Sequence, residues 1–261
     1  MIGQIPSYPD LTGQVAIITG GAAGIGLAIA SAFSEQGCHL VLIDVERGSL
    51  SEAAKRIQDR GTDVFTVAGS VAEQDPIRDA CAEAIKRWTR VDILVNNAGI
   101  SAVHPSLDLS LQDWKRVLDV NLTGVFVCAQ EAARQMIRAG RGVILNISSA
   151  YGIVAAPNRV AYCATKAAVA MMSKVLAIEW AEKGLRVNAL APGYVETNLV
   201  MDLVKQGKID LQALARRTPQ GRIATPEEIA RVAVFLASNA SSHITGQVIA
   251  VDGGWTAYGY V

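Results

Sequence analysis

Short runs of apolar, β-branched residues alternate along the chain with longer segments whose apolar residues recur at helical spacing. The short runs contain few polar residues, which is typical of strands that are covered on both faces of a sheet. Strands separated by helices indicate a parallel sheet. The predicted strands are 15–19, 40–44, 63–68, 93–96, 143–148, 186–190 and 248–251, and the predicted helices are 26–36, 49–60, 74–88, 111–138, 159–183 and 226–238.

This pattern predicts the α/β class. We expect a doubly wound (Rossmann) sheet of about seven parallel strands with helices on both faces. A chain of 261 residues suits a single domain, so residues 1–261 are taken as one unit. Ligands of such sheets bind beyond the carboxyl ends of the strands. The long interval 192–225 lacks strand character, and we expect a substrate-binding loop or lid at about 193–225.

Composition narrows the range of functions. The 24 basic and 24 acidic residues cancel, which gives no electrostatic reason to expect nucleic acid or a membrane surface as partner. Residues 1–14 lack the pattern of a signal peptide, and no uncharged apolar run is long enough to cross a bilayer. The 4 cysteines are scattered and the 3 histidines isolated, so we expect a cytoplasmic protein with reduced thiols, no metal and a small-molecule substrate.

A glycine-rich segment follows the first predicted strand. It reads T-G-x-x-x-G-x-G from Thr19 through Gly20, Gly24 and Gly26, not the strict G-x-G-x-x-G spacing. Small residues let the backbone approach a pyrophosphate, and a helix N-terminus directs free N–H groups toward it. A tight turn that needs glycine only for its geometry is an equally good interpretation of this loop alone.

An acidic residue favours the cofactor interpretation. Asp44 ends the second predicted strand, where a carboxylate can accept hydrogen bonds from the adenosine ribose hydroxyls. The same charge would repel a 2′-phosphate, so NAD is favoured over NADP. Arg47 lies close enough in sequence to soften that preference, and an ordinary turn residue remains the alternative for Asp44.

Further motifs follow in a fixed order: Asn96-Asn97-Ala98-Gly99, Asn121, Ser148-Ser149, Tyr162-Cys163-Ala164-Thr165-Lys166 and Pro192-Gly193. Together with the glycine loop they resemble the short-chain dehydrogenase/reductase family, from about residue 11 to about residue 254. Tyr-x-x-x-Lys alone arises often by chance, whereas this set in this order on the expected elements is specific.

The chemistry of the Tyr-Lys pair follows from the residues themselves. Tyr162 and Lys166 share one face of a predicted helix. A nearby ammonium favours the phenolate, so we expect the pKa of Tyr162 to be lowered from about 10. Such a tyrosine exchanges a proton with an alcohol as hydride moves to or from nicotinamide. Ser149, at the end of a neighbouring strand, is predicted to hold the substrate oxygen.

The resemblance implies further roles. Lys166 would also bind the nicotinamide ribose, and Asn121 would anchor a water that links Lys166 to solvent. Val195 and Thr197 would contact the nicotinamide carboxamide, although Thr197 is equally suited to cap a helix. In place of the Asp that often binds adenine in this family, the chain has Ser70 and Val71. The full set of predicted cofactor contacts is Gly20, Ala23, Gly24, Ile25, Gly26, Asp44, Ser70, Val71, Asn97, Ala98, Gly99, Tyr162, Lys166, Pro192, Gly193, Val195 and Thr197.

The helices at 111–138 and 159–183 predict self-association. The segment between Lys166 and Lys174 carries no charge, and a helix that is apolar all round must be covered on every side. Burial within one subunit is the alternative. Because the family pairs these two helices between subunits, the resemblance implies a homotetramer. The aromatic C-terminal segment 255–261 is interpreted as an interface element or as a loose tail.

The substrate is predicted from the residues expected around the site, which are Ser101, His104, Ala150, Asn158, Tyr194, Asn198 and Met201. Their hydroxyl, amide and imidazole groups suit a polyhydroxylated molecule, and the segments 187–197 and 253–255 resemble bacterial polyol and sugar dehydrogenases. We therefore expect NAD-dependent exchange between a secondary alcohol and a carbonyl. The alternatives are a 3-oxoacyl-thioester reductase and, in another class, a non-catalytic nucleotide-binding regulator.

Overall fold

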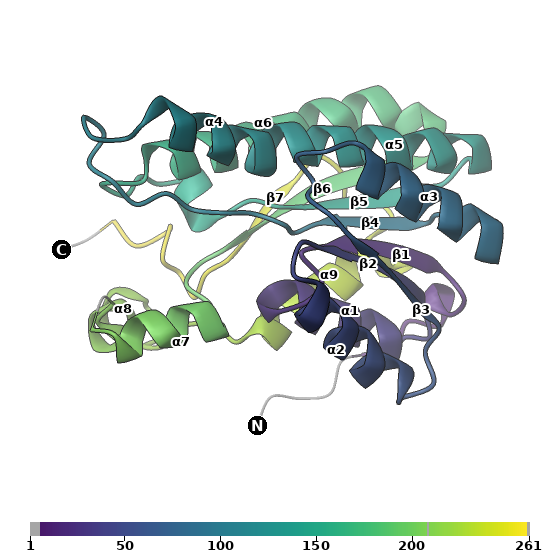
Figure 1. Ribbon diagram of the computed structural model, residues 1–261, viewed down its shortest axis with the longest axis horizontal. Helices are drawn as coiled ribbons and strands as arrows, with labels where there is room; N and C mark the ends of the chain where they lie inside the picture. Colours follow the sequence, from purple (N-terminus) through teal and green to yellow (C-terminus); the bar gives the residue numbers. More distant parts are fainter. Residues whose placement is uncertain (1–5, 208, 260–261) are drawn as a thin grey trace.

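A computed structural model describes residues 6–207 and 209–259. Its centre is a 7-stranded parallel sheet with the order β3-β2-β1-β4-β5-β6-β7 (Figure 1). The strands are β1 (Val15–Thr19), β2 (His39–Asp44), β3 (Val64–Ala68), β4 (Ile93–Asn96), β5 (Gly142–Ile147), β6 (Leu185–Pro192) and β7 (Val248–Val251). The order reverses at β1, and this switch point opens a crevice beyond the carboxyl ends of β1 and β4.

Helices cover both faces of the sheet. They are α1 (Gly24–Glu35), α2 (Arg47–Gln58), α3 (Asp75–Trp88), α4 (Leu111–Leu118), α5 (Gly124–Ala139), α6 (Val160–Trp180), α7 (Asn198–Lys205), α8 (Leu211–Arg217) and α9 (Pro226–Ala237). Apolar side chains of α1, α2 and α9 form one core with the sheet, and those of α3, α5 and α6 form the other. The predicted doubly wound fold is therefore confirmed, with strand ends within about two residues of those expected.

Two predicted segments differ in detail. The helix expected over 111–138 contains a π-helical turn at Asp119–Thr123 between α4 and α5. The strandless interval after β6 folds into α7 and α8, and this pair projects away from the two helical layers (Figure 1). The one bridge found there joins Val195 to Ala224. Periodicity alone does not reveal a single π turn, because apolar residues recur at helical spacing on both sides of it.

Helix α6 is the longest helix of the described chain, and most of its residues are apolar. With the turn that follows it, Val160–Lys183, it is long and apolar enough to cross a membrane by composition, with a mean hydropathy of 1.3. The core helix of a globular fold passes the same test. Here α6 packs on β6, and 44% of its apolar window is buried within the subunit.

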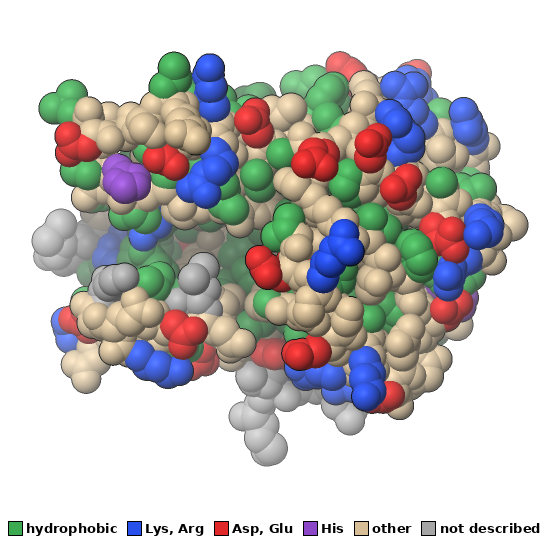
Figure 2. Space-filling model, viewed as in Figure 1, with side chains coloured by type: hydrophobic (Ala, Val, Ile, Leu, Met, Phe, Trp, Pro, Cys, Tyr) green, Lys and Arg blue, Asp and Glu red, His purple; other side chains and the backbone are tan. Residues whose placement is uncertain are grey.

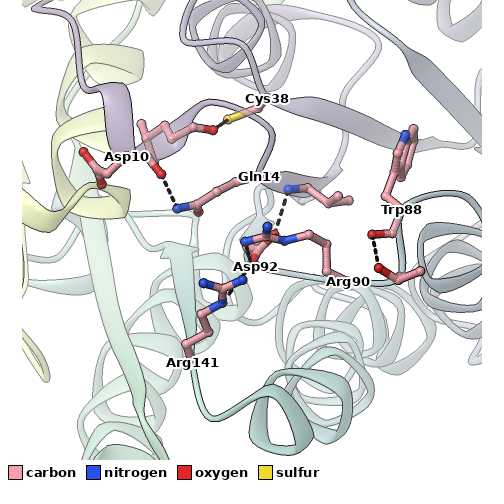
Figure 3. A network of polar contacts seen from close by, with 10 residues as sticks. Asp10, Gln14, Cys38, Trp88, Arg90, Asp92 and Arg141 are labelled. Carbon is pink, nitrogen blue, oxygen red and sulfur yellow. Dashed lines mark hydrogen bonds and ion pairs between the residues drawn. The ribbon is translucent and has the colours of Figure 1, made fainter.

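A buried aspartate joins the amino ends of the central strands (Figure 3). Asp92 accepts hydrogen bonds from the Val15 amide at 2.9 Å and from the Arg90 Nε and Nη2 atoms at 2.5 and 2.6 Å, and Arg141 lies at 3.6 Å. Asp92 precedes β4 and Val15 begins β1, so the carboxylate fixes the spacing of the two strands that flank the crevice. This network lies at the amino ends of the strands, away from the crevice at their carboxyl ends. We therefore interpret it as a contribution to the stability of the fold.

Replacing Asp92 with Asn should destabilise the protein. The change keeps the shape but removes the charge that pairs with Arg90, and we expect a loss of about 1–3 kcal/mol in the free energy of unfolding. Urea denaturation at one protein concentration measures the change. Asp75→Asn, which breaks an exposed pair with Arg78, is the control and should cost less than about 1 kcal/mol. Equal effects of the two substitutions would contradict the assignment.

Candidate active site

A cleft of about 650 Å³ lies at the carboxyl edge of the sheet. Figure 2 shows the surface hollowed between the layer that contains α4 and α6 and the projecting α7–α8 pair. The residues that line the cleft come from the ends of β4, β5 and β6, the start of α6, the segment 193–203 and Ile209, with Ile25 from α1, Arg116 from α4 and Trp255 from the C-terminal region. Of the predicted residues, those lining it are Ile25, Asn97, Gly99, Ser101, Ser149, Ala150, Tyr162, Lys166, Pro192, Gly193, Tyr194, Val195 and Thr197.

The glycine loop is built for close approach of backbone to backbone. A Cβ on Gly26 would lie 2.0 Å from the Gly20 carbonyl oxygen, and Gly20 itself has a positive φ of 64°. The Asn97 side chain donates to the Thr19 and Gly20 carbonyls, each at 3.0 Å, and so ties the loop to the end of β4. Side chains larger than hydrogen would fill this cradle, so the loop has the shape that a pyrophosphate needs at the N-terminus of α1.

Asp44 lies beside this loop at the end of β2. Its Oδ2 accepts a hydrogen bond from the Ala22 amide at 3.0 Å, and its Oδ1 accepts one from Glu46 at 3.2 Å. The carboxylate is thus fixed next to the glycine loop and remains partly exposed. This is the position that the ribose hydroxyls of a bound dinucleotide would require.

Lys166 is a buried lysine whose charge has one strong acceptor. Its Nζ donates to the carbonyl oxygen of Ile147, the last residue of β5, at 2.7 Å. Burial lowers the pKa of Lys166 to about 8. A Cβ on Gly99 would lie 3.4 Å from both this Nζ and the Asn121 Oδ1, so the three residues converge on one point of the cleft.

Asn121 lies in the π-helical turn and is fully buried. Its amide forms a pair of hydrogen bonds with Ile100, accepting from the backbone N–H and donating to the carbonyl, both at 2.8 Å. The π turn thus carries a side chain that bonds the loop after β4. The structure therefore brings Asn121 beside Lys166 and gives it a structural contact as well.

Tyr162 differs from its prediction. Burial raises its pKa above 10, while a hydrogen bond with the Ser149 hydroxyl and the positive charge of Arg159 act in the opposite direction. The Nζ of Lys166 lies 5.7 Å from the centre of the phenol ring, and burial is the largest influence on the pKa of Tyr162. The expectation of a lowered pKa is therefore wrong for the residues as they are placed here.

The two serines after β5 have separate tasks. Ser148 donates to the Lys166 carbonyl at 2.8 Å and is buried, so it holds α6 to the sheet. Ser149 caps a short 3₁₀ turn by accepting from the Tyr151 amide at 3.1 Å, and its hydroxyl faces Tyr162. Only Ser149 lies where it can share a substrate oxygen with the tyrosine.

Other predicted cofactor residues lie at the edges of the cleft or beyond it. Thr197 caps α7 by accepting from the Val200 amide at 3.3 Å, and its methyl group faces Gly24. Ser70 accepts a hydrogen bond from Ala72, and the Val71 carbonyl packs against Gly124. The predicted residues outside the cleft lining follow β1, β2, β3 and β4 at the same edge of the sheet: Gly20, Ala23, Gly24, Gly26, Asp44, Ser70, Val71 and Ala98.

The substrate wall was predicted only in part. His104, Asn158, Asn198 and Met201 do not line the cleft, to which α7 contributes Val200 and Leu203. Sequence reasoning missed Arg116, Tyr151, Arg159 and Trp255, which do line it. Arg159 starts the helix that carries Tyr162, and that proximity was the available signal. Among the described residues, no cluster of three His, Cys, Asp or Glu side chains can hold a metal.

Comparison with known proteins shows which family this chain resembles. A family model described as enoyl-(acyl carrier protein) reductase matches residues 20–256. The chain is 41% identical to a cis-4-hydroxycyclohexanecarboxylate dehydrogenase of Sinomonas cyclohexanicum, covering 94% of this chain and 97% of the relative. It is 42% identical to a D-threitol dehydrogenase of Mycolicibacterium smegmatis, covering 94% of each chain.

A solved structure of a dehydrogenase is also similar to this chain in sequence and in fold. The gluconate 5-dehydrogenase of Burkholderia cenocepacia, in complex with NADP and tartrate, is 40% identical, with a TM-score of 0.89 over 96% of this chain and 98% of the other. The protein thus belongs to the oxidoreductases that act on CH–OH groups with a nicotinamide cofactor. More narrowly, it is a member of the short-chain dehydrogenase/reductase family.

Lys166→Met should change how stability depends on pH. The folded protein releases the Lys166 proton near pH 8, whereas the unfolded chain holds it to about 10.5, so the unfolded state binds more protons between these values. The charged lysine therefore destabilises the fold below pH 8, and this penalty disappears as pH rises. We expect the free energy of unfolding of the wild type, relative to Lys166→Met, to be flat below pH 8 and to rise toward pH 10.

Urea denaturation across this pH range measures the difference. The buried thiols of Cys38, Cys81 and Cys128, whose pKa burial raises to about 12, act equally in both proteins and cancel. Lys174→Met, at an exposed position on the same helix, is the matched control. A difference that stays flat, or falls, from pH 8 to 10 would refute the assigned direction.

Proposed function

We propose that the protein oxidises a secondary alcohol to a carbonyl, or catalyses the reverse reaction, with NAD as cofactor and Tyr162 as the acid/base. The observation that carries this proposal is the convergence of Ser149, Tyr162 and Lys166 on one wall of the cleft. A non-catalytic regulator would not need this set. The glycine loop, Asp44, Lys166 and Thr197 would hold the dinucleotide.

The residues of the chain divide the work as follows. The bound nicotinamide supplies or accepts the hydride. Ser149 and Tyr162 hold the substrate oxygen between their hydroxyl groups, and Tyr162 transfers the proton at its phenol oxygen. Because burial raises the pKa of Tyr162, the phenol keeps its proton near neutral pH and suits donation to a carbonyl, while alkaline conditions favour oxidation. Below about pH 8 the charged Lys166 Nζ lies 5.7 Å from the centre of the phenol ring and attracts negative charge that develops on Tyr162, and Asn121 holds the loop beside it.

The preference for NAD rests on Asp44. A fixed carboxylate beside the ribose site accepts hydrogen bonds from two hydroxyls and repels a 2′-phosphate. A solved relative binds NADP, and a relative named NAD-dependent glycerol dehydrogenase is 37% identical, so we base the preference of this chain on the local charge of Asp44.

The substrate class is supported by the relatives. Their names include D-threitol and gluconate, which fits a polyol or sugar hydroxyl. A 3-oxoacyl-thioester reductase is the second candidate, favoured by a 38% identical relative named 3-oxoacyl-[acyl-carrier-protein] reductase and by apolar wall residues such as Ile100, Val103 and Val200. Residues 193–225, which contain α7 and α8, would act as the lid over this substrate.

The assembly is proposed to be a homotetramer in the cytoplasm. Met171, Val175 and Ile178 form an exposed apolar stripe at helical spacing on α6, with Ile178 80% exposed, and Phe126 is exposed on α5. Sedimentation equilibrium should give a tetramer at micromolar concentration, and Ile178→Glu should weaken it. Leu107→Glu, at a fully exposed loop position, should leave the mass unchanged. A monomeric wild type would overturn the proposal.

Tyr162→Phe should abolish most turnover without removing cofactor binding. Loss of the proton-transfer group should lower kcat by about 10²- to 10⁴-fold. Reduced-nicotinamide fluorescence measures binding, and absorbance measures turnover over a panel of polyols, sugars and hydroxyacyl thioesters. Tyr151→Phe, in the same cleft and bonded to Tyr194, is the control and should cost less than about tenfold. Turnover retained in Tyr162→Phe would exclude the mechanism.

Asp44→Ser should shift cofactor preference toward NADP. The hydroxyl keeps one ribose contact but removes the negative charge, so the ratio of kcat/KM for NAD to that for NADP should fall by about 10- to 100-fold. Binding constants for both nucleotides, measured in parallel, show whether the change is in affinity. Urea denaturation controls for the lost contact with Ala22. An unchanged ratio would show that Asp44 does not select the cofactor.

A further inference from the structure

Arg159 is a positive charge in the substrate half of the cleft that the reaction outlined above does not require. It immediately precedes α6, one turn before Tyr162, and its side chain is half-buried along the cleft wall. Its Nη1 donates to the Ser101 hydroxyl at 3.3 Å, and its guanidinium lies 5.9 Å from the centre of the Tyr151 ring. The group is thus oriented by one hydroxyl and one aromatic ring.

No acidic side chain balances this charge. Within residues 6–207 and 209–259, no carboxylate lies within ion-pair distance of the Arg159 guanidinium. The second arginine of the cleft, Arg116, differs because its Nη2 pairs with Asp113 at 3.2 Å and its side chain is 60% exposed. Of the two arginines that line the cleft, Arg159 is therefore the one without an acidic partner among the described residues.

The surroundings of Arg159 increase the strength of an ionic contact. Ile100, Val103 and Trp255 belong to the same cleft lining, and apolar walls reduce the screening of charge by water. A guanidinium presents a planar fork that fits the two oxygens of a carboxylate, and the Ser101 hydroxyl beside it can donate a further hydrogen bond. A doubly charged phosphate would require more cationic groups than this wall provides.

We propose that the substrate is a hydroxy acid, whose carboxylate binds Arg159 and Ser101 while its secondary hydroxyl reaches Ser149 and Tyr162. This inference rests on the proposed function, since it names the substrate class of the same site. Arg159 and Tyr162 lie one helical turn apart, so the two ends of a small molecule reach both groups at once. The residue then determines specificity, because a neutral alcohol would leave the guanidinium without a partner in a partly desolvated cleft.

Arg159 has a second possible effect, because its charge also lowers the pKa of Tyr162. Loss of that effect alone would slow every substrate equally and move the pH profile of turnover. Loss of a substrate contact would instead raise KM for acids and leave neutral substrates unaffected. A comparison of matched acids and amides separates the two roles.

The experiment uses small secondary hydroxy acids, straight-chain and cyclic, each with its primary carboxamide as a neutral partner of the same shape. Turnover with NAD is measured for the wild type, Arg159→Gln, Arg159→Lys and Arg116→Gln. We expect the wild type to prefer the best acid over its amide by about 10- to 100-fold in kcat/KM. Arg159→Gln should remove that preference through KM, Arg159→Lys should restore part of it, and Arg116→Gln should change it by less than about threefold.

A readout without turnover accompanies the kinetics. Thermal denaturation of Tyr162→Phe with NAD should show stabilisation by the acid but not by the amide, and Arg159→Gln introduced into that protein should remove it. Turnover of amides equal to that of acids, or equal losses for both in Arg159→Gln, would refute the hydroxy-acid assignment while leaving the oxidoreductase function intact. Absence of turnover for every alcohol, with NAD bound, would refute the proposed function itself, and stabilisation by the acid would then still support the carboxylate site.

Discussion

The site is organised around a buried ammonium group. Lys166 donates from α6 to the last carbonyl of β5, and its own carbonyl accepts from Ser148 just beyond that strand. These two hydrogen bonds fix where α6 lies along the sheet and which of its faces points toward the sheet. A Cβ on Gly152 would lie 2.8 Å from the Lys166 carbonyl oxygen, so the loop between β5 and α6 also fits closely against this residue. Tyr162 and Ser149 face each other because the same lysine aligns the elements that carry them.

Burial has opposite consequences for the two titratable groups of this wall. It favours the uncharged form of each, which lowers the pKa of Lys166 and raises that of Tyr162. Burial thus favours a neutral lysine and a neutral phenol over the ammonium–phenolate ion pair that Coulomb attraction alone would favour. A ligand that brings negative charge or new hydrogen bonds into the cleft would change this balance, so the protonation of the pair depends on what is bound.

The fold was predictable because its signal is local. Most buried strands form nearly continuous apolar runs, and most helices begin near glycine, serine, threonine or proline, so the elements and the class of fold followed from the sequence. The glycine loop, Asp44, Ser149, Tyr162 and Lys166 were found from residue type and spacing, and the structure places them at one edge of the sheet. The short bridge between Val195 and Ala224, by contrast, has no pattern that periodicity can detect.

What escaped prediction depends on side-chain direction and on burial. The cleft lining includes Val200 and Leu203 of α7 but not Asn198, which depends on the tertiary placement of that helix and not on the sequence pattern. The importance of Arg159 depends on which acids lie near it in space. The raised pKa of Tyr162 depends on how far burial removes water, a quantity that spacing along a helix does not contain.

The C-terminal segment forms part of the reaction chamber. Arg217 at the end of α8 donates to the carbonyls of Trp255 and Tyr258 and packs over both rings, while Trp255 lies against Tyr194 in the cleft wall. Arg217 therefore joins the projecting helices directly to residues 255–258. A fusion at the carboxyl end therefore adjoins a segment that forms part of the substrate wall, whereas the described amino-terminal residues contact the end of α1 and the turn after α9. Preparations for kinetic work are better extended at the amino end.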